Sequence, residues 1–306
     1  MPAFGRLVTA MVTPFDEQGE VDYKQAAALA KGLIECGSDS LVVAGTTGES
    51  PTLSTEEKLR LFGAVKGAVG HRGQVIAGTG NYNTRESIEL TREAEATGID
   101  GILLVVPYYN KPPQEGLYQH FRAIAAATHL PCILYNVPSR TALNMTAETV
   151  IRLSEIENIV GVKEASGNLD QISEIITRAR RGFLVYSGND GDTLPVLAIG
   201  GYGVVSVASH LVGMRIAEMI RLAVEGKLEQ AAAIHGELMP LVKALFQTTS
   251  PIPLKAAMNL SGFRVGKPRL PLVELDAKST ESLQILLGRM KLDNYLAPEA
   301  AALRRS

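Results

Sequence analysis

The sequence predicts a (β/α)8 barrel, that is, eight parallel strands with helices between them, followed by a helical appendage. Two observations lead to this fold class. Short apolar runs rich in β-branched residues alternate eight times with amphipathic segments, at a spacing of about 25 residues. After the eighth run, only helical patterns follow. Eight βα units is the number that closes a barrel, and 306 residues is long enough for a barrel with an appendage.

The predicted strands are nearly continuous apolar runs, which is the pattern of strands that are buried on both faces of a parallel sheet. Each run is followed by a segment with the apolar spacing of a helix. The strands are predicted at Leu7–Val12, Ser40–Ala44, Gln74–Gly78, Gly101–Val106, Cys132–Tyr135, Ile159–Lys163, Leu184–Tyr186 and Gly203–Val207.

Two of the predicted helices have clear N-terminal signals. Ser54 and Glu57 have the spacing of a capping box, and Asn83 is an N-cap residue with Glu86 three residues later. The helices between the strands are predicted at Asp22–Glu35, Thr55–Val69, Arg85–Ala96, Gln114–Ala127, Ala147–Leu153, Leu169–Ala179 and Thr193–Ile199.

The C-terminal quarter of the sequence has helical patterns only, without a low-complexity linker. A boundary is predicted near Glu225-Gly226, between a barrel of residues 1–225 and a C-terminal helical domain of residues 226–306. Helices that follow the last strand are predicted at Val212–Val224, Leu228–Leu245, Ile252–Leu260 and Ser279–Met290.

An open, doubly wound sheet is the main structural alternative, since it also alternates strands with helices. Its dinucleotide-binding fingerprint is missing, because Gly78-Thr79-Gly80 is followed by Asn83 where the third glycine belongs. The sequence therefore favours the barrel.

The composition is typical of a soluble globular protein, with 46% hydrophobic and 20% charged residues and a net charge of −2. The absence of a basic block argues against nucleic-acid binding. No apolar run approaches the roughly 20 residues of a membrane span, and the N-terminus lacks the pattern of a signal peptide. Cys36 and Cys132 form no CxxC pair, which favours buried free thiols and a cytoplasmic location.

The sequence contains no arrangement typical of a metal or cofactor site. The histidines fall in predicted helices or their flanks without metal-ligand spacing, so we expect surface or capping roles for them. The segment Gly188–Asp192 is faintly similar to a calcium loop, but it lacks the downstream ligands, and helix capping is the preferred interpretation. The five histidines are His71, His120, His129, His210 and His235.

Hydroxyl groups, glycines and one amine follow the predicted strands. Because the carboxyl ends of barrel strands meet at one rim, where active sites lie, these residues are expected to gather there. Acidic pairs and histidines do not occur at these positions. The residues in question are Thr13, Thr46, Thr47, Asn81, Tyr108, Tyr109, Tyr135, Asn136, Lys163, Ser187, Gly188 and Ser206.

Lys163 ends an apolar strand, an unusual place for a cation. Loss of water favours the neutral, nucleophilic form of an amine, which is the usual route to a Schiff-base lysine. Strand alternation predicts that Ile159, Gly161 and Lys163 share one face, with Gly161 leaving room beneath the amine. Alternatively, Lys163 extends to solvent or pairs with Glu164. Lys255 is a second apolar-flanked lysine, which we expect to extend to solvent from the appendage.

Four motifs occur in order, each at the end of a predicted strand. On these motifs the chain closely resembles the dihydrodipicolinate synthase family, within the pyruvate-dependent class I lyase superfamily, over nearly its whole length. The resemblance implies condensation of pyruvate with L-aspartate 4-semialdehyde to 4-hydroxy-tetrahydrodipicolinate, a step towards diaminopimelate and lysine. The motifs are Gly45–Ser50 (GTTGES), Pro107–Asn110 (PYYN), Tyr135–Thr141 (YNVPSRT) and Gly161–Gly167 (GVKEASG).

The resemblance also implies catalytic roles. Lys163 would form an imine with pyruvate, and the enamine derived from it would attack the aldehyde. Tyr135 would carry protons in a relay with Thr47 and Tyr109. Members of the family insert the tyrosine that matches Tyr109 into the neighbouring subunit's site. A dimer would therefore be the minimal active unit, and a homotetramer, a dimer of dimers, is expected.

Substrate-binding roles follow from the same resemblance. Thr46 and Thr47 would hold the carboxylate of pyruvate through hydroxyl and backbone N–H groups. Arg140 would bind the carboxylate of aspartate semialdehyde with its planar guanidinium group. Gly188 and Val205 would contribute backbone carbonyls near the substrate. No metal and no organic cofactor is implied.

Two other functions are compatible with the same residues. A sialic acid lyase or a keto-deoxy sugar acid aldolase uses the same imine, but it needs more groups that bind a polyol than the stretch around Tyr108-Tyr109 and Arg140 offers. A barrel that has lost catalysis and serves as a binding protein is disfavoured by the intact Lys163 and Tyr135.

The resemblance also bears on regulation by lysine. Family members that lysine inhibits often have histidines where this chain has Thr55 and Lys58, and an asparagine where it has Tyr82. Glu86 does match their regulatory pocket. A cation at Lys58 should repel the ammonium group of a lysine effector, so weak or absent inhibition is expected.

Overall fold

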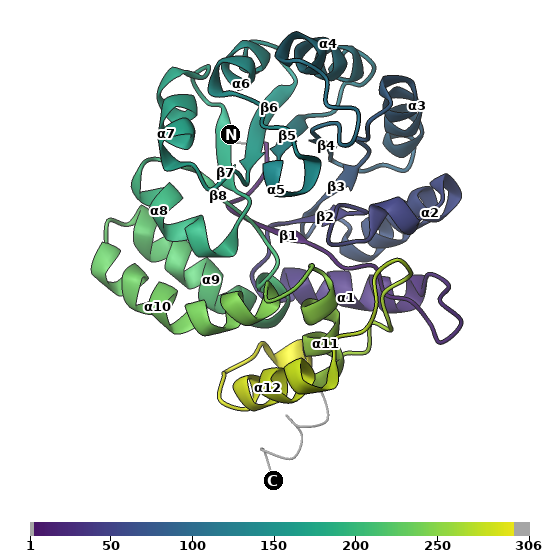
Figure 1. Cartoon of the computed structure of the whole chain (residues 1–306), viewed down its shortest axis with the longest axis vertical. Coiled ribbons are helices and arrows are strands. Elements are labelled where there is room, and N and C mark those ends of the chain that lie inside the picture. Colours follow the sequence, from purple (N-terminus) through teal and green to yellow (C-terminus); the bar gives the residue numbers. More distant parts are fainter. Residues whose placement is uncertain (1–2, 297–306) are drawn as a thin grey trace.

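The computed structural model describes residues 3–296 and contains a closed barrel of eight parallel strands (Figure 1). Each strand pairs with the next in sequence, and the eighth pairs with the first. Helices surround the barrel between successive strands. The predicted (β/α)8 fold is therefore confirmed, and the alternative of an open, doubly wound sheet is excluded. The strands are β1 (Leu7–Ala10), β2 (Ser40–Val43), β3 (Gln74–Gly78), β4 (Gly101–Val105), β5 (Cys132–Asn136), β6 (Ile159–Glu164), β7 (Leu184–Ser187) and β8 (Gly203–Ser206).

The helices follow the predicted order with small shifts at their ends. Both N-terminal signals act as expected: Ser54 and Glu57 form a capping box, and the Asn83 side chain accepts the backbone N–H groups of Arg85 and Glu86. The α-helices are α1 (Tyr23–Glu35), α2 (Thr55–Val69), α3 (Thr84–Glu95), α4 (Gln114–Ala125), α5 (Pro138–Thr141), α6 (Ala147–Ser154), α7 (Leu169–Arg178), α8 (Thr193–Ala198), α9 (Ser209–Val224), α10 (Leu228–Leu245), α11 (Ile252–Leu260) and α12 (Ala277–Leu287), and the 3-10 turns are η1 (Ser50–Thr52), η2 (Asp190–Asp192) and η3 (Asn294–Leu296).

The hydrophobic core has two layers, which alternate along each strand. One lies between the strands and the helices, and the other fills the barrel itself. Because successive side chains of a strand point to opposite faces, both faces of these strands are apolar. The buried residues inside the barrel include Val8, Val42, Ile76, Leu103, Ile133, Tyr135, Tyr186 and Val205.

A bulge in β6 changes the predicted alternation on that strand. Cys132 of β5 pairs with Ile159, but the next residue, Ile133, pairs with Gly161, so Val160 has no partner of its own. Ile159 consequently packs in the outer layer, and the prediction that it shares a face with Lys163 is wrong. The space beside Gly161 belongs to the neighbouring strand, since an added Cβ there would lie 2.5 Å from the carbonyl oxygen of Leu184. Gly161 therefore permits close strand packing and does not leave room for the amine.

The appendage, formed by α10, α11 and α12, lies against one side of the barrel in the lower part of Figure 1. A turn at Gly226, with a left-handed φ of 77°, separates α9 from α10. We propose this turn as the boundary between a barrel of residues 1–225 and a helical domain of residues 226–306, of which 297–306 lie outside the described part of the chain.

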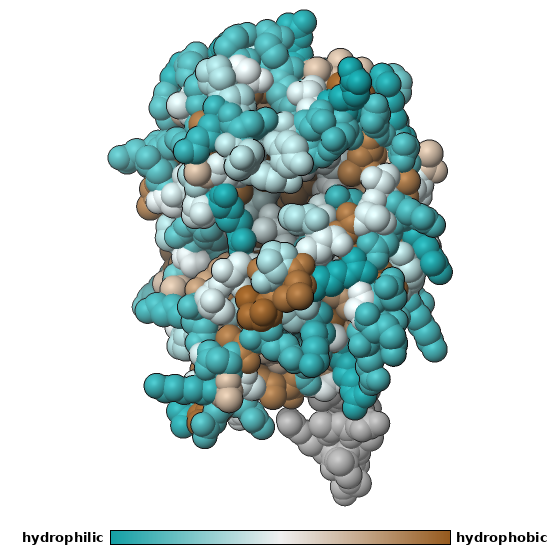
Figure 2. All heavy atoms as spheres, turned by 45° about the vertical axis from the view of Figure 1, so that its right-hand side comes forward, coloured by the Kyte–Doolittle hydropathy of each residue, from teal (hydrophilic) through white to brown (hydrophobic). Residues whose placement is uncertain are grey.

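The surface face in Figure 2 is mostly hydrophilic, with small separate hydrophobic patches. Among residues 3–296, no helix is both long enough and apolar enough to span a membrane. Cys36 and Cys132 are free and buried, as predicted. Burial raises the pKa of the Cys132 thiol to about 12, so this thiol stays protonated and inert.

Candidate active site

Lys163 lies near the carboxyl end of β6 with its side chain inside the barrel. It is 5% exposed, and its Nζ atom lies 4.0 Å from the centre of the Tyr135 ring on β5. The two residues are paired in register between the strands, which places the amine over the aromatic face. Within residues 3–296, no carboxylate oxygen lies within 4.0 Å of this amine. Lys163 is thus a buried amine without an ion-pair partner.

Glu164, the alternative partner of Lys163, faces away from the amine. Both of its carboxylate oxygens accept from Asn136, Gln171 Nε2 donates to one of them at 3.1 Å, and Ser166 N–H donates to the other at 2.8 Å. Burial raises the pKa of Glu164, and these hydrogen bonds oppose the shift. Because successive side chains of a strand point to opposite faces, Lys163 and Glu164 lie on different faces. The alternative interpretation, in which the two form an ion pair, is therefore wrong.

A pocket of about 200 Å³ opens at the carboxyl ends of β2 to β5. It includes Thr46, Tyr135 and Arg140, which the sequence predicted as site residues. Its wall, within the described chain, contains a cation and several hydroxyl groups but no aspartate or glutamate, which suits an anionic ligand. The lining residues are Ala44, Gly45, Thr46, Ser50, Pro51, Gly78, Gly80, Leu103, Val105, Tyr108, Tyr135, Val137, Arg140 and Thr141.

The loop that follows β2, residues 45–49, is here called the threonine loop. Thr46 lines the pocket, whereas Thr47 lies beside it and is 6% exposed. The hydroxyl of Thr13, after β1, donates to the carbonyl of Gly48 at 2.6 Å. The loop is also closed on itself, because Glu49 N–H donates to the carbonyl of Thr46 at 3.1 Å.

Arg140 reaches the pocket from α5, a single helical turn that follows β5. Its Nη2 atom donates to the carbonyl of Ser250, in the segment before α11, at 3.1 Å. Ala142 ends this turn with a left-handed φ of 55°. The turn, which sequence periodicity did not predict, projects the guanidinium group over the pocket.

Gly188 and Val205 lie inside the barrel close to Lys163 and Tyr135. A Cβ added at Gly188 would lie 3.2 Å from Cγ of Lys163 and 2.7 Å from Cβ of Ala165, so only glycine leaves the lysine side chain undisturbed. Val205 of β8 is 1% exposed and packs in the barrel interior with Tyr135.

Tyr109 is the one predicted site residue that lies apart from the others. It is 92% exposed, with a left-handed φ of 74°, whereas the preceding Tyr108 lines the pocket. The strained backbone turns two adjacent tyrosines to different surroundings. Within its own chain, Tyr109 is displayed to solvent.

Asp190 is a buried polar residue near Lys163 that the sequence interpretation missed. It accepts from the Ser206 hydroxyl and from the backbone N–H groups of Val207 and Ala208 at 2.9 and 3.1 Å. Burial raises the pKa of this carboxyl, while its hydrogen bonds and the charge of Lys163 oppose the shift. Capping was predicted for this segment, but Asp190 binds the chain that leads into α9. Its signal in the sequence is an aspartate between two glycines after a strand.

Two further predictions are wrong. His120 and His210 are 5% and 0% exposed rather than on the surface. Nε2 of His210 accepts the Val12 N–H at 3.1 Å and Nδ1 donates to the carbonyl of Val207, so this histidine joins loops inside the molecule. Lys255 does not extend to solvent. Its side chain is 1% exposed, with Nζ 2.6 Å from Oε1 of Glu49.

The geometry fits carbonyl chemistry at an amine. A buried lysine lies beside a tyrosine, next to a pocket that has hydroxyl groups and one guanidinium group. Among residues 3–296, no cluster of three or more histidine, cysteine, aspartate or glutamate side chains could hold a metal ion.

The model of the Dihydrodipicolinate synthetase family matches residues 3–289. The chain belongs to this family. A 4-hydroxy-tetrahydrodipicolinate synthase from Dehalococcoides mccartyi is 60% identical over 293 residues, which cover 96% of this chain and 99% of that protein. One from Heliobacterium modesticaldum is 57% identical over 290 residues, 95% of this chain and 97% of that protein.

Solved structures of the family agree with the fold. A dihydrodipicolinate synthase from Bacillus anthracis superposes with a TM-score of 0.93 at 47% identity, over 95% of this chain and 100% of that one. A dihydrodipicolinate synthase from Cyanidioschyzon merolae, with lysine bound, gives a TM-score of 0.92 at 51% identity, over 95% of this chain and 100% of that one. The family resemblance found in the four motifs is thereby confirmed.

Proposed function

We propose that the protein is a 4-hydroxy-tetrahydrodipicolinate synthase, which condenses pyruvate with L-aspartate 4-semialdehyde. The observation that carries this proposal is the buried amine of Lys163, without a carboxylate partner, beside Tyr135 and a pocket that contains Thr46 and Arg140. Near-full-length relatives of up to 60% identity that carry this name support it.

The reaction begins at Lys163. Its neutral amine adds to the ketone carbon of pyruvate, and loss of water gives an imine. Loss of a proton from the methyl group gives an enamine, whose carbon attacks the aldehyde of the second substrate. Each step moves a proton, and we assign this transfer to the hydroxyl group of Tyr135, whose ring centre lies 4.0 Å from the amine.

The two carboxylates are assigned to two parts of the pocket. Thr46 and Thr47 hold the carboxylate of pyruvate through hydroxyl and backbone N–H groups, and Arg140 binds that of aspartate semialdehyde. Gly188 and Val205 supply backbone carbonyls near Lys163. The position of Thr46 and Arg140 in one pocket wall supports this assignment. No metal and no organic cofactor takes part.

Tyr109 acts in the site of a neighbouring subunit, where it completes the proton relay with Tyr135 and Thr47. Its exposure of 92% within its own chain supports a role outside that chain. The minimal active unit is then a dimer, and a dimer of dimers is the expected assembly. One similar solved structure, at 42% sequence identity, is a monomeric variant of dihydrodipicolinate synthase. Sedimentation measurements on this protein therefore test the assembly.

Inhibition by lysine is proposed to be weak or absent. Lys58 is half-buried, and although burial lowers its pKa, the charge of Glu86 opposes the shift and favours a cation. Such a cation repels the ammonium group of lysine, and Thr55 and Tyr82 replace groups that inhibited relatives use. The cytoplasm, where free thiols such as Cys36 persist, is the proposed location.

Reduction with borohydride in the presence of pyruvate tests the proposal. We expect a pyruvate adduct on the peptide that contains Lys163, detected by mass spectrometry, and none after Lys163→Ala. An adduct on Lys255, or no adduct at all, would refute the mechanism. A coupled assay that compares aspartate semialdehyde with sialic acid and keto-deoxy sugar acids then identifies the second substrate.

A further inference from the structure

The threonine loop is attached to the helical appendage through one buried carboxylate. Glu49, the last residue of the loop, is 2% exposed and has a left-handed φ of 55°. Its Oε1 atom lies 2.6 Å from Nζ of Lys255 on α11, and its Oε2 atom accepts the backbone N–H of Arg269 at 2.9 Å. Both partners lie after α10, in the appendage. A non-glycine residue adopts this backbone conformation only where its surroundings enforce it.

The amine of Lys255 is surrounded by further contacts besides Glu49. It also donates to the carbonyl of Lys267 at 3.2 Å and lies 4.0 Å from the centre of the Phe15 ring. Burial lowers the pKa of Lys255 to about 8, and the charge of Glu49 opposes this shift. Removal of either charge would leave the other buried without its counter-ion, so the two side chains act as one unit.

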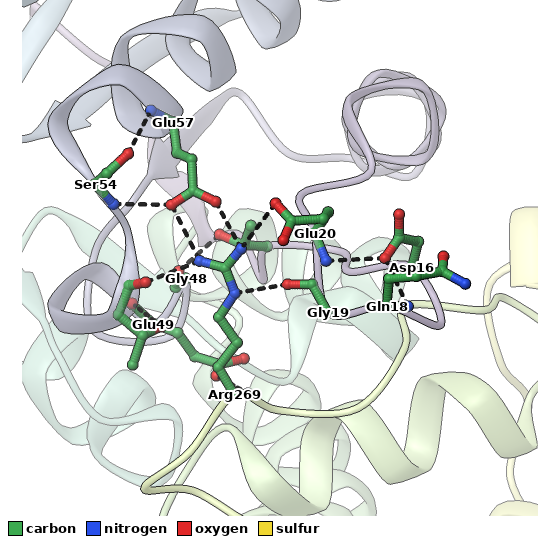
Figure 3. Close-up of polar contacts among 11 residues, drawn as sticks. Asp16, Gln18, Gly19, Glu20, Gly48, Glu49, Ser54, Glu57 and Arg269 are labelled. Carbon is green, nitrogen blue, oxygen red and sulfur yellow. Dashed lines mark hydrogen bonds and ion pairs between the residues drawn. The ribbon is translucent and has the colours of Figure 1, made fainter.

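Arg269 forms a second set of contacts between the appendage and the barrel, at the segment after the threonine loop and at the start of α2. Its guanidinium group donates to the carbonyl of Thr52 at 2.8 Å, to the two oxygens of Glu57 at 3.0 and 2.6 Å, and to the carbonyl of Gly19 at 2.7 Å (Figure 3). The hydrogen bond from Arg269 lowers the pKa of Glu57, which therefore stays ionised at neutral pH. One side chain thus joins three segments of the barrel.

The opposite side of the loop is held by the barrel itself. The Thr13 hydroxyl donates to the carbonyl of Gly48 at 2.6 Å, and the backbone of Val12 is bound by His210. The loop is therefore fixed by neutral hydrogen bonds on one side and by the ionic contacts of the appendage on the other. Because the backbone N–H of Glu49 donates to the carbonyl of Thr46 at 3.1 Å, we expect a shift of Glu49 to move the pocket wall.

We propose that Lys255 and Arg269 are positioning residues, which hold the threonine loop through Glu49 in the conformation that binds the carboxylate of the 2-oxo acid. The inference rests on the proposed condensation of pyruvate. It assigns the appendage a part in substrate binding, although no appendage residue up to residue 296 lines the pocket. Loss of these contacts should weaken pyruvate binding more than it affects Lys163.

The experiment uses the full-length protein and three variants. Glu49→Gln removes the ion pair but keeps an acceptor for Arg269, and Arg269→Lys keeps the charge and the backbone contact to Glu49 but loses the forked donor. Lys267→Met is the matched control, since the Lys267 side chain lies in the same segment and is 75% exposed. For each protein, KM for pyruvate, KM for aspartate semialdehyde, kcat and the melting temperature are measured.

For Glu49→Gln we expect KM for pyruvate to rise on the order of 10- to 100-fold. The KM for aspartate semialdehyde should stay within about threefold, since Arg140 lies on α5, after a different strand. Arg269→Lys should raise KM for pyruvate less, and Lys267→Met should leave it unchanged. Borohydride should still trap the pyruvate adduct on Lys163 in each variant at saturating pyruvate.

A purely structural role predicts a different result: a lower melting temperature with KM for pyruvate within twofold of the wild type. That outcome overturns the proposal. If Glu49→Gln does not fold, Arg269→Lys decides, because it keeps Glu49 and Lys255 intact. If the wild-type protein forms no pyruvate adduct, the proposed function fails, whereas an adduct with unchanged pyruvate KM in the folded variants overturns only the positioning role.

Discussion

Lys163 and Lys255 are two buried lysines with opposite surroundings. Both follow apolar residues in the sequence, and both side chains are almost fully removed from solvent. Lys255 has the carboxylate of Glu49 at 2.6 Å, whereas Lys163 has only the face of Tyr135 and, among residues 3–296, no carboxylate within 4.0 Å. The amine of Lys255 is therefore held in an ion pair, whereas that of Lys163 lies over the Tyr135 ring beside the pocket. Burial is common to both lysines, so the groups around each amine distinguish the ion-paired Lys255 from Lys163, the proposed nucleophile.

His210 extends the comparison to a buried base that has no carboxylate oxygen within 4.0 Å in the described part of the chain. It is 0% exposed, and burial lowers its pKa to about 4, so the imidazole is neutral at pH 7. Its two ring nitrogens are both used in hydrogen bonds to the backbone. His210 is thus a buried base whose two ring nitrogens are both occupied, whereas the reaction proposed for Lys163 uses an amine that lies beside an open pocket.

The largest effect is expected for Lys163→Ala. Because no lysine lines the pocket among residues 3–296 and Lys163 is the buried amine beside it, kcat should fall on the order of 10⁴-fold or more, while the fold is retained. Steady-state rates and circular dichroism measure both effects. If the variant kept activity within tenfold of the wild type, Lys163 would not be the nucleophile, and the proposed difference in role between Lys163 and Lys255 would be refuted.

Lys255→Met should instead act on stability. It leaves Glu49 buried without its counter-ion, and such changes cost about 3–5 kcal/mol of unfolding free energy. Chemical denaturation measures the loss. The double variant Glu49→Gln/Lys255→Met removes both charges and should recover part of it. A single variant as stable as the wild type would show that the pair contributes nothing.

Acid should destabilise the protein through His210. Its folded pKa of about 4 is lower than the ordinary value of 6.5, so the unfolded chain takes up a proton first as the pH falls. Stability present above pH 6.5 is then lost towards pH 4, by up to about 3 kcal/mol. Unfolding free energies of wild type and His210→Gln across this range measure the contribution. Parallel curves would mean that His210 titrates normally.

The smallest effect is expected at Lys58, a half-buried lysine near Glu86. Lys58→His removes most of the positive charge at neutral pH and should strengthen inhibition by lysine by roughly fivefold, about 1 kcal/mol. Inhibition constants for wild type and variant test this, with Lys267→Met as a surface control. A low inhibition constant in the wild type would contradict the prediction that its inhibition is weak.

The fold was predictable because its signals are local. Apolar runs, helical spacing and the caps at Ser54 and Asn83 each depend on a few neighbouring residues, and eight repeats leave little choice of topology. The bulge at Val160 was not predictable, because an extra residue in one strand is defined only by its pairing with another.

The site was predictable in part. Thr46, Tyr135 and Arg140 line one pocket because strand ends meet at one rim. The ion pair of Glu49 with Lys255 was missed, since periodicity carries no information about contacts across so many residues. The apolar residues on either side of Lys255 indicated that it lies near a core. Whether its side chain forms an ion pair or extends to solvent depends on a carboxylate from another part of the chain.

The left-handed backbone at Tyr109 directs this side chain away from its own chain. If Tyr109 acts in a neighbouring subunit as proposed, each active site needs residues from two chains. Specific activity should then decline on dilution as the complexes dissociate. Mixing inactive Tyr109→Phe with inactive Lys163→Ala should restore some activity, because a hybrid pair contains one site with both groups intact.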